Sequence, residues 1–259
     1  MSLYEIVRDA LRANQPIALA TVVEGRYLGG TLVVRPDGTT AGTLGDDDLD
    51  RAVARDAVGE LEAGRSSARH YGERGEARQE ALTVFVAAFA SSPRLVIFGA
   101  VDFSAALARI GKLLGFQVTV CDARRAFATR ARFPMADEVV VDWPDRYLAQ
   151  VGPMLGPRDA VCVLTHDAKF DVPAIATAVK MPVGYIGAMG SRRTHVEREA
   201  RLREAGLDDE ALRRVMSPIG LDIGARTPEE TAVSICAEII ASRSGRSQRS
   251  LRDTPGPIH

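Results

Sequence analysis

The sequence has little of several features that mark particular classes of protein. Its 259 residues include three cysteines, one tryptophan and 5% aromatic residues. Cys121, Cys162 and Cys236 are odd in number and far apart, which argues against a disulfide framework and indicates reduced, buried thiols. No two of them have the Cys-x-x-Cys spacing of a metal site, so we expect them to pack in the core and predict no metal site.

The sequence also lacks an excess of charge and a long apolar run. It has 33 basic and 34 acidic residues, so no global field attracts nucleic acid or an anionic membrane. The first twenty residues contain Glu5 and Asp9 and lack the apolar core of a secretion signal, and no later apolar run approaches the length of a membrane span. We therefore expect a cytoplasmic protein with no nucleic-acid partner and no membrane partner.

The pattern along the chain predicts two domains of different kinds. Residues 1–91 should form a small α+β domain, because β-rich segments bounded by glycine turns occur there beside helical patterns. The composition changes after Ser91-Ser92-Pro93, which is the expected junction. The expected elements are helices at 3–13 and 48–64, strands at 17–23, 31–35, 39–44 and 82–90, and a polar loop or strand–turn–strand excursion at 65–80.

Residues 92–243 predict an α/β domain. Strands that are apolar on both faces alternate there with amphipathic helices, which is typical of a parallel sheet covered on both sides. Residues 244–259 should form a flexible, basic tail. The expected strands lie at 94–99, 116–122, 138–142, 160–165 and 183–187, and the expected helices at 103–114, 145–151, 172–179, 191–205 and 228–242.

Polar residues and glycines follow most of these strands. Ligands of open parallel sheets bind beyond the carboxyl ends of the strands, so these residues are the candidate binding site. They are Gly99, Asp102, Asp122, Arg124, His166, Asp167, Lys169, Gly187, Gly190, Ser191, Arg192, Arg193, Gly220, Asp222, Gly224 and Arg226.

The first turn resembles a dinucleotide-binding turn only in part. Gly99 ends a strand, and Asp122 follows at roughly the 20-residue offset at which an acidic group meets a ribose hydroxyl. Val101, however, places a branched side chain where the backbone would approach a pyrophosphate, and Asp102 adds a negative charge. The alternative is a tight strand-to-helix turn with Asp102 as the N-cap. We expect this turn to pack the sheet and shape the crevice, and the arginine and glycine loops to bind most of the ligand.

The segment YIGAMGSRRTHVERE (185–199) is a stronger candidate for anion binding. Ser191 can cap the helix, and the free amides of the first helical turn would lie beside Arg192 and Arg193, which suits a phosphate. The alternative is a solvated basic helix start in which one of these arginines pairs with Glu197 or Glu199.

Two further segments have mixed interpretations. Thr227, Pro228 and Glu230 predict a capping box, whereas Gly220, Asp222, Gly224 and Arg226 in the loop before it have a composition suited to holding a ligand. His166 and Asp167 could serve acid–base chemistry, but no nucleophile is identifiable in the sequence, and an N-cap role for Asp171 is the plainer interpretation of this stretch.

Taken together, five segments resemble the carboxy-terminal domain of the XdhC/CoxI family, accessory proteins of xanthine and carbon monoxide dehydrogenases. The likeness covers about residues 94–242. The segments are GAVDFSAALARIGKLLGFQVTVCDAR, ARFPMADEVVVDWP, VLTHDAKFDVPAI, YIGAMGSRRTH and SPIGLDIGARTPEETAVSICAEII.

The resemblance implies a Rossmann-like domain preceded by a smaller α+β domain, and a role in maturing molybdenum hydroxylases. It implies a carrier, rather than a catalyst, that binds the molybdenum cofactor as molybdopterin or its dinucleotide form. The implied partners are a cysteine desulfurase and a molybdenum hydroxylase subunit, and a homodimer is expected. Two alternatives stay open: an NAD(P)-dependent oxidoreductase that uses Asp122 and Arg124 for the ribose with His166 or Lys169 near a substrate, and an interaction scaffold that binds no small molecule.

The chain departs from the family pattern in two ways. Members often carry Ser-Gly-Gly-Cys in the amino-terminal domain and Cys-Gly-Gly before the Rossmann part, whereas this chain has AGTLGDDDLDRAV (41–53) and no cysteine upstream of 82–86. Many members have Gly-Ala-Gly-His at the first turn, where this chain has Gly-Ala-Val-Asp (99–102). A thiolate can hold molybdenum or relay sulfur, so the missing cysteines argue against direct thiol chemistry in the amino-terminal domain.

Overall fold

The computed structural model describes residues 2–13, 15–76 and 81–254. The chain divides into two compact units, Met1–Ser91 and Ser92–His259. Residues 77–80 of the expected polar loop and residues 255–259 of the expected tail lie outside the described residues, as do Met1 and Asn14.

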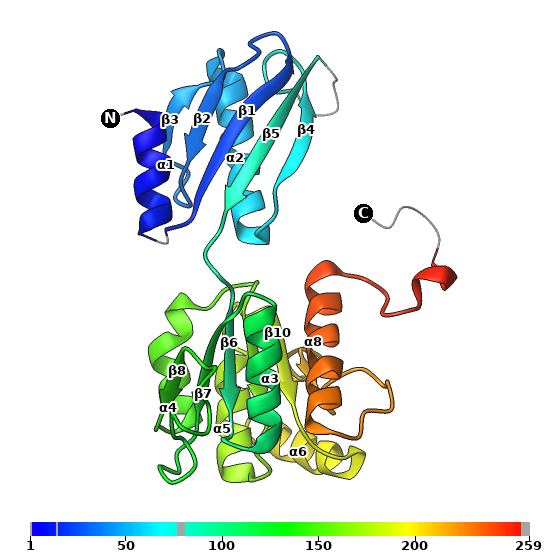
Figure 1. Cartoon of the computed structure of the whole chain (residues 1–259). Coiled ribbons are helices and arrows are strands. Elements are labelled where there is room, and N and C mark those ends of the chain that lie inside the picture. Colours follow the sequence, from blue (N-terminus) through cyan, green and yellow to red (C-terminus); the bar gives the residue numbers. More distant parts are fainter. Residues whose placement is uncertain (1, 14, 77–80, 255–259) are drawn as a thin grey trace. The chain divides into compact units, whose positions relative to one another are not determined.

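The first unit is an antiparallel sheet with two helices. Its strand order is β3-β2-β1-β5-β4, and β1 pairs with both β2 and β5. Helix α2 packs against four of the five strands (Figure 1). The elements are α1 (Leu3–Arg12), β1 (Ile17–Gly25), β2 (Thr31–Val34), β3 (Thr40–Thr43), α2 (Asp47–Ala63), β4 (Ser67–Tyr71) and β5 (Leu82–Phe89).

Capping and amphipathicity explain where α2 lies. Asp46 accepts hydrogen bonds from the amides of Asp48 and Leu49, and Gly64 ends the helix in the left-handed conformation. Leu49, Val53 and other apolar residues of one helix face are buried against the alternating apolar residues of the sheet. The predicted small α+β domain is confirmed.

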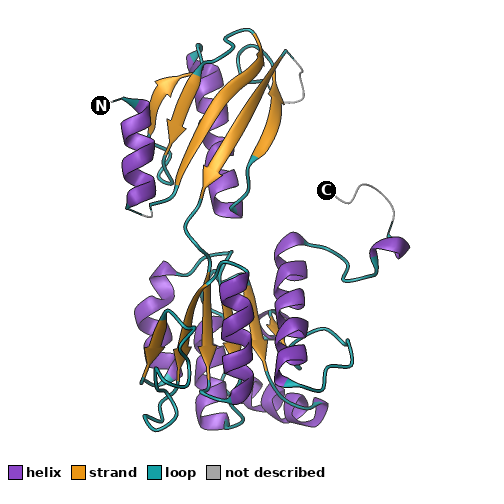
Figure 2. Cartoon of the chain, viewed as in Figure 1, coloured by secondary structure: helices purple, strands orange, loops and turns teal. Residues whose placement is uncertain are grey.

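The second unit is a Rossmann-type α/β domain. Helices follow β6, β9 and β10 directly, and two more precede β9 and β11 (Figure 2). Its elements are β6 (Arg94–Phe98), α3 (Asp102–Leu113), β7 (Gln117–Cys121), β8 (Glu138–Val140), α4 (Pro144–Val151), η1 (Gly152–Met154), β9 (Ala160–Val163), α5 (Ala168–Ala178), β10 (Tyr185–Ala188), α6 (Arg192–Glu204), α7 (Asp209–Arg213), β11 (Val215–Met216), α8 (Pro228–Ser244) and η2 (Leu251–Asp253).

All six strands of this sheet are parallel, in the order β11-β10-β9-β6-β7-β8. The order reverses between β6 and β9, and the crevice beyond the carboxyl ends of the strands at such a reversal is where Rossmann folds bind ligands. All the strands end on one side of the sheet, which is called the carboxyl edge below. The predicted parallel sheet is confirmed.

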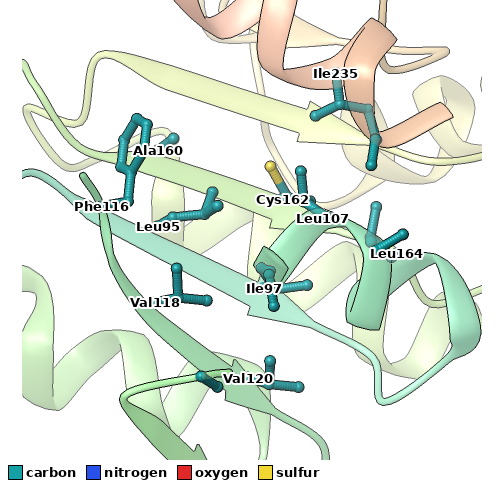
Figure 3. Close-up of a cluster of buried hydrophobic side chains, with 14 of the residues drawn as sticks. Leu95, Ile97, Leu107, Phe116, Val118, Val120, Ala160, Cys162, Leu164 and Ile235 are labelled. Carbon is teal, nitrogen blue, oxygen red and sulfur yellow. The ribbon is translucent and has the colours of Figure 1, made fainter. Parts of the chain in front are cut away.

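Both faces of the sheet are covered by helices. Figure 3 shows one face, where Leu95 and Ile97 of β6 meet Leu107 of α3 and Ile235 of α8. On the other face Val96 and Phe98 pack with residues of α4, α5 and α6. Burial of both faces explains why the strands are apolar throughout instead of alternating.

Three details differ from the sequence prediction. The N-cap of α3 is Val101, and Asp102 is the first helical residue, so the prediction of Asp102 as N-cap is wrong. The N-cap of α5 is Asp167, which accepts from the amide of Lys169, so the prediction for Asp171 is also wrong. The helix therefore begins at Ala168, earlier than expected. The short elements α7 and β11 were not predicted, because five and two residues carry too little periodicity.

Candidate functional site

The first turn of the Rossmann unit is closely packed. Gly99 has φ +103°, and a Cβ atom there would lie 2.9 Å from Cγ2 of Thr165 and 3.0 Å from its backbone nitrogen. Only glycine allows this approach, because other residues disfavour such a φ and the added carbon would clash. The turn after β6 therefore contacts the turn after β9 directly, at the point where the strand order reverses.

The carboxylate of Asp122, just after β7, is engaged within the protein. It accepts hydrogen bonds from the amide of Ala100 at 2.8 Å and from Nε and Nη2 of Arg124 at 2.9 and 2.7 Å, and its side chain is 2% exposed. Burial acts to raise the pKa of Asp122, but the hydrogen bonds from Arg124 and from backbone amides outweigh burial and lower it. Asp122 thus fixes the first turn and orients Arg124, whose guanidinium also stacks on Phe127.

An arginine that the sequence did not single out reaches the same turn. Nη1 of Arg132 donates to the carbonyl oxygen of Ala100 at 3.1 Å, and Nη2 lies 3.5 Å from a carboxylate oxygen of Asp102. Asp102 itself is 88% exposed. A carboxylate at a helix start competes with any anionic ligand for the positive end of the helix dipole. The start of α3 is therefore poorly suited to a phosphate.

The turn after β9 carries His166, Asp167 and Lys169 near the start of α5. Asp167 and Lys169 form an exposed ion pair at 3.1 Å. His166 is exposed, and no hydrogen bond joins its side chain to any of the described residues. Those three residues lie together as expected, but no arrangement of nucleophile and base accompanies them in the described part of the chain.

The turn from β10 into α6 is open and positively charged. Ser191 is the N-cap, and its Oγ accepts from the amide of Thr194 at 3.1 Å. The amides of Arg192 and Arg193 are left without an intrahelical acceptor, as in the first turn of any helix. The Arg193 side chain pairs with Glu197 at 2.9 Å, as the alternative of a solvated basic helix start predicted. Arg192 is exposed and forms no ion pair among the described residues.

Gly187 and Gly190 differ in position. Gly187 lies inside β10, and the space that a Cβ would take there is filled by Ile219 and by the hydroxyl of Tyr185. It therefore serves the packing of the sheet. Gly190 follows β10 and precedes the Ser191 cap, where it forms part of the turn itself.

The loop between β11 and α8 is fixed at one end and open at the other. Gly220 donates its amide to Glu238 of α8 at 2.8 Å, and Glu238 also accepts from the hydroxyl of Tyr185. The loop then runs outward through three exposed residues of the candidate site, Asp222, Gly224 and Arg226. Glu230 accepts from the amides of Arg226 and Thr227, so the predicted capping box is confirmed.

A buried ion pair lies behind the carboxyl edge. Oδ2 of Asp171 is 2.9 Å from Nη2 of Arg198, and both side chains are almost wholly buried. Burial raises the pKa of Asp171 in spite of the hydrogen bond from Thr165 and the charge of Arg198. No pattern in the sequence indicated Arg198, because it lies in the strongly charged segment 192–204, where nothing distinguishes it from its neighbours.

The cysteines are confirmed as core residues. Cys121, Cys162 and Cys236 are free and buried. Burial raises the pKa of Cys121 and of Cys236 to about 12 and that of Cys162 well above its usual value. Thiols in this state are inert as nucleophiles and as metal ligands. Within 2–13, 15–76 and 81–254, no group of three or more His, Cys, Asp or Glu side chains could hold a metal ion.

At the start of α6, the amides of Arg192 and Arg193 and the guanidinium of Arg192 have the chemistry that an anionic ligand requires. Fifteen of the predicted residues follow strand ends at the carboxyl edge or begin the next helix, and Gly187 lies within a strand. None of the described helices is long and apolar enough to cross a membrane.

Two protein-family models match the chain. The model described as the XdhC Rossmann domain matches residues 95–239, which is more than half of the chain, and the model described as the XdhC and CoxI family matches residues 10–72. Each match falls within one of the two structural units.

Three curated proteins are similar to parts of the chain. YqeB of Escherichia coli is 30% identical over 88% of this chain and 43% of its own length. A probable xanthine dehydrogenase subunit from Bacillus subtilis is 36% identical over 62% of this chain and 46% of its own. The molybdenum cofactor insertion chaperone PaoD of Escherichia coli is 30% identical over 41% of this chain and 33% of its own. The chain thus spans less than half the length of each relative.

A crystal structure from Bacillus halodurans, named a xanthine dehydrogenase, has the same fold. It matches with a TM-score of 0.56 and 23% identity over 98% of both chains. With a family model matched over most of the Rossmann unit and a second over much of the amino-terminal unit, the chain belongs to the XdhC and CoxI family.

Proposed function

We propose that this protein binds the molybdenum cofactor and takes part in its insertion into a molybdenum hydroxylase. Support comes from the family and from the similarity to PaoD, which is named a molybdenum cofactor insertion chaperone. The single observation that carries the proposal to this chain is the start of α6, where two amides beside the Arg192 guanidinium have no hydrogen-bond partner among the described residues.

The residues present fit the phosphorylated part of this cofactor. A phosphate or pyrophosphate needs N–H donors and positive charge, and the start of α6 offers the amides of Arg192 and Arg193 and the guanidinium of Arg192. The exposed Arg226 near the start of α8 is a further cation at the same edge. When bound, the group would supply a molybdenum centre for oxidation and hydroxylation in the client enzyme. The role of this chain is to hold the cofactor.

The chain does not fit a thiol-based role at the metal. All three cysteines are buried with raised pKa values, so none supplies a thiolate at neutral pH. Any sulfur transfer to the cofactor must use a thiol of another protein, and a cysteine desulfurase is the partner of that chemistry. The client would be a xanthine or carbon monoxide dehydrogenase type of hydroxylase. A homodimer stays a prediction.

The test is cofactor uptake by the purified full chain. Molybdenum cofactor released from a hydroxylase is titrated in at two salt concentrations, and bound pterin is measured by fluorescence after gel filtration. Arg192→Gln should weaken uptake several-fold and reduce the salt dependence, because one cation next to the phosphate is removed. Arg201→Gln, an exposed arginine near the opposite end of α6, is the matched control and should bind like the wild type. Equal uptake by both variants, or no uptake by the wild type, would contradict the proposal.

A second candidate is an NAD(P)-dependent activity, favoured by the strand order of a dinucleotide-binding sheet. It requires Asp122 or Arg124 to contact a ribose, although these two side chains already bind one another. Fluorescence titration with NADPH separates the candidates. Tight binding that Arg124→Gln abolishes and Arg192→Gln leaves unchanged would favour the second.

A further inference from the structure

One hydrogen-bonded cluster connects the ends of neighbouring strands behind the carboxyl edge. It is called the edge network here and consists of Thr165, Asp171, Met189, Arg198 and Ser217. Oγ1 of Thr165 donates to Oδ1 of Asp171, whose other oxygen binds Arg198. Nη2 of Arg198 also donates to the carbonyl oxygen of Met189 at 2.6 Å, and Nη1 donates to Oγ of Ser217 at 3.1 Å.

Each contact of the edge network holds a different turn. Thr165 follows β9 and lies against Gly99, the first residue after β6. Met189 follows β10 and directly precedes the glycine turn into α6, and Ser217 follows β11 and begins the loop into α8. The guanidinium of Arg198, in the middle of α6, thus binds the ends of two strands. One end leads to Arg192 and the other to the loop that carries Arg226.

The edge network is a poor source of folding stability. A buried ion pair loses the hydration of both charges, and an apolar pair of similar volume is often at least as stable. Nε of Arg198 is buried and has no hydrogen-bond partner among the described residues, which adds an unsatisfied donor to that cost. The pair instead fixes the positions of its hydrogen-bond partners, because a planar guanidinium can hold several acceptors at fixed angles.

Met216 and Ile219, on either side of Ser217, pack against the core, but apolar side chains do not fill the space beside Ser217 itself. A cavity of about 220 Å³ lies between α6, α7 and β11, and Arg198 and Ser217 are among its lining residues. The hydrogen bond from Arg198 holds Ser217 at the start of the loop. The amides of Ile219 and Gly220, which donate to the carbonyl oxygen of Ala188 and to Glu238, hold the residues that follow.

We propose that Arg198 and Asp171 are positioning residues that set the turns after β9, β10 and β11 in the arrangement that receives the ligand. They act through Met189 and Ser217 and do not themselves touch the ligand. This inference rests on the proposed function only for the identity of the ligand.

The experiment measures amide hydrogen exchange by mass spectrometry on the full chain without ligand. Arg198→Lys keeps the charge beside Asp171, but one nitrogen cannot reach both Met189 and Ser217. We expect at least ten-fold faster exchange in 189–195 and 217–221, with α3, α8 and the first unit unchanged. The double variant Asp171→Leu with Arg198→Met should unfold in urea near the wild-type midpoint and show the same local increase, which separates positioning from stability.

The matched control is Glu60→Gln, which weakens another buried ion-pair cluster. Glu60 is bound by Arg65, Ser67 and Arg69 in the first unit, so this variant should leave exchange in 189–195 and 217–221 unchanged. Exchange that rises equally throughout the Rossmann unit in Arg198→Lys, or does not rise in either segment, would overturn the inference. Pterin uptake is then measured as above, where Arg198→Lys should bind several-fold more weakly than the wild type. A wild type that fails to bind pterin would refute the proposed function and leave the exchange result standing.

Discussion

Two strand-to-helix turns of the same sheet differ in how far their polar groups are engaged by the protein itself. In the turn from β6 into α3, other parts of the protein already occupy the space and the hydrogen-bond donor. The amide of Ala100 donates to Asp122, Thr165 packs against Gly99, and Asp102 places a negative charge at the helix start. The turn from β10 into α6 leaves two amides and the Arg192 guanidinium open. The Rossmann topology thus fixes where turns occur, whereas the residues in each turn decide which one can bind an anion.

The largest effect on stability is expected from adding a side-chain carbon at Gly99, where the first turn is most closely packed. Gly99→Ala should lower the free energy of unfolding by about 2–4 kcal/mol, because it adds a carbon against Thr165 at an unfavourable φ. Urea unfolding followed by circular dichroism measures it. Gly224→Ala is the control, since φ there is +72° with no atom within 4 Å of the added carbon, and should cost about 1 kcal/mol. Equal losses would mean that the contact with Thr165 is not tight.

The next effect concerns the carboxylate that occupies the first turn. Asp122→Asn should lower the free energy of unfolding by about 1–3 kcal/mol at pH 7, because it weakens the bonds to Arg124 and to the amide of Ala100. The pKa of Asp122 is lowered in the folded protein, so its contribution is complete above the unfolded pKa of about 3.9 and is lost as the pH falls through the folded value.

The difference between wild type and Asp122→Asn should therefore be full at pH 7 and smaller at pH 3. Urea unfolding at the two pH values checks it. Asp222→Asn is the control, because Asp222 is exposed and makes no ion pair among the described residues, and it should show no difference at either pH. A difference for Asp122→Asn that grows on acidification would contradict the assignment of the ionised form to the folded protein.

A smaller effect is expected at the second turn. Ser191→Ala removes the N-cap of α6 and should lower the free energy of unfolding by about 1 kcal/mol. Pterin uptake should change little, since the amides of Arg192 and Arg193 are not those that Ser191 bonds. Thermal unfolding and the uptake assay check both halves. Loss of uptake with unchanged stability would instead make Ser191 a ligand contact.

The smallest effect should come from neutralising the acid of the first turn. Asp102 is exposed, and its distance to Arg132 is long for an ion pair, so Asp102→Asn should leave the unfolding transition unchanged. It should also leave pterin uptake unchanged if the anion binds at α6. A clear rise in uptake would reverse the roles of the two turns, because it would place the phosphate beside α3.

Much of the fold was predictable because it is encoded locally. The apolar strands 94–98 and 160–163 and the capping box at Thr227 lie within short segments, and the structure confirms them. The start of α5 was misjudged because two aspartates, Asp167 and Asp171, compete for the same role. The choice depends on Thr165 and Arg198, which bury Asp171 and leave Asp167 free to cap the helix.

Short stretches of residues were enough to predict the alternation of strands and helices, the burial of the three cysteines, and Ser191 as the cap of the helix that begins at Arg192. Two features could be seen only in the folded chain. The carboxylate of Asp122 accepts hydrogen bonds from Arg124 and from the amide of Ala100. Arg198 links the turns after β9, β10 and β11. Parallel strands bring distant segments to one edge, so the partner of a buried charge is chosen by the order of the strands and not by neighbours in the chain.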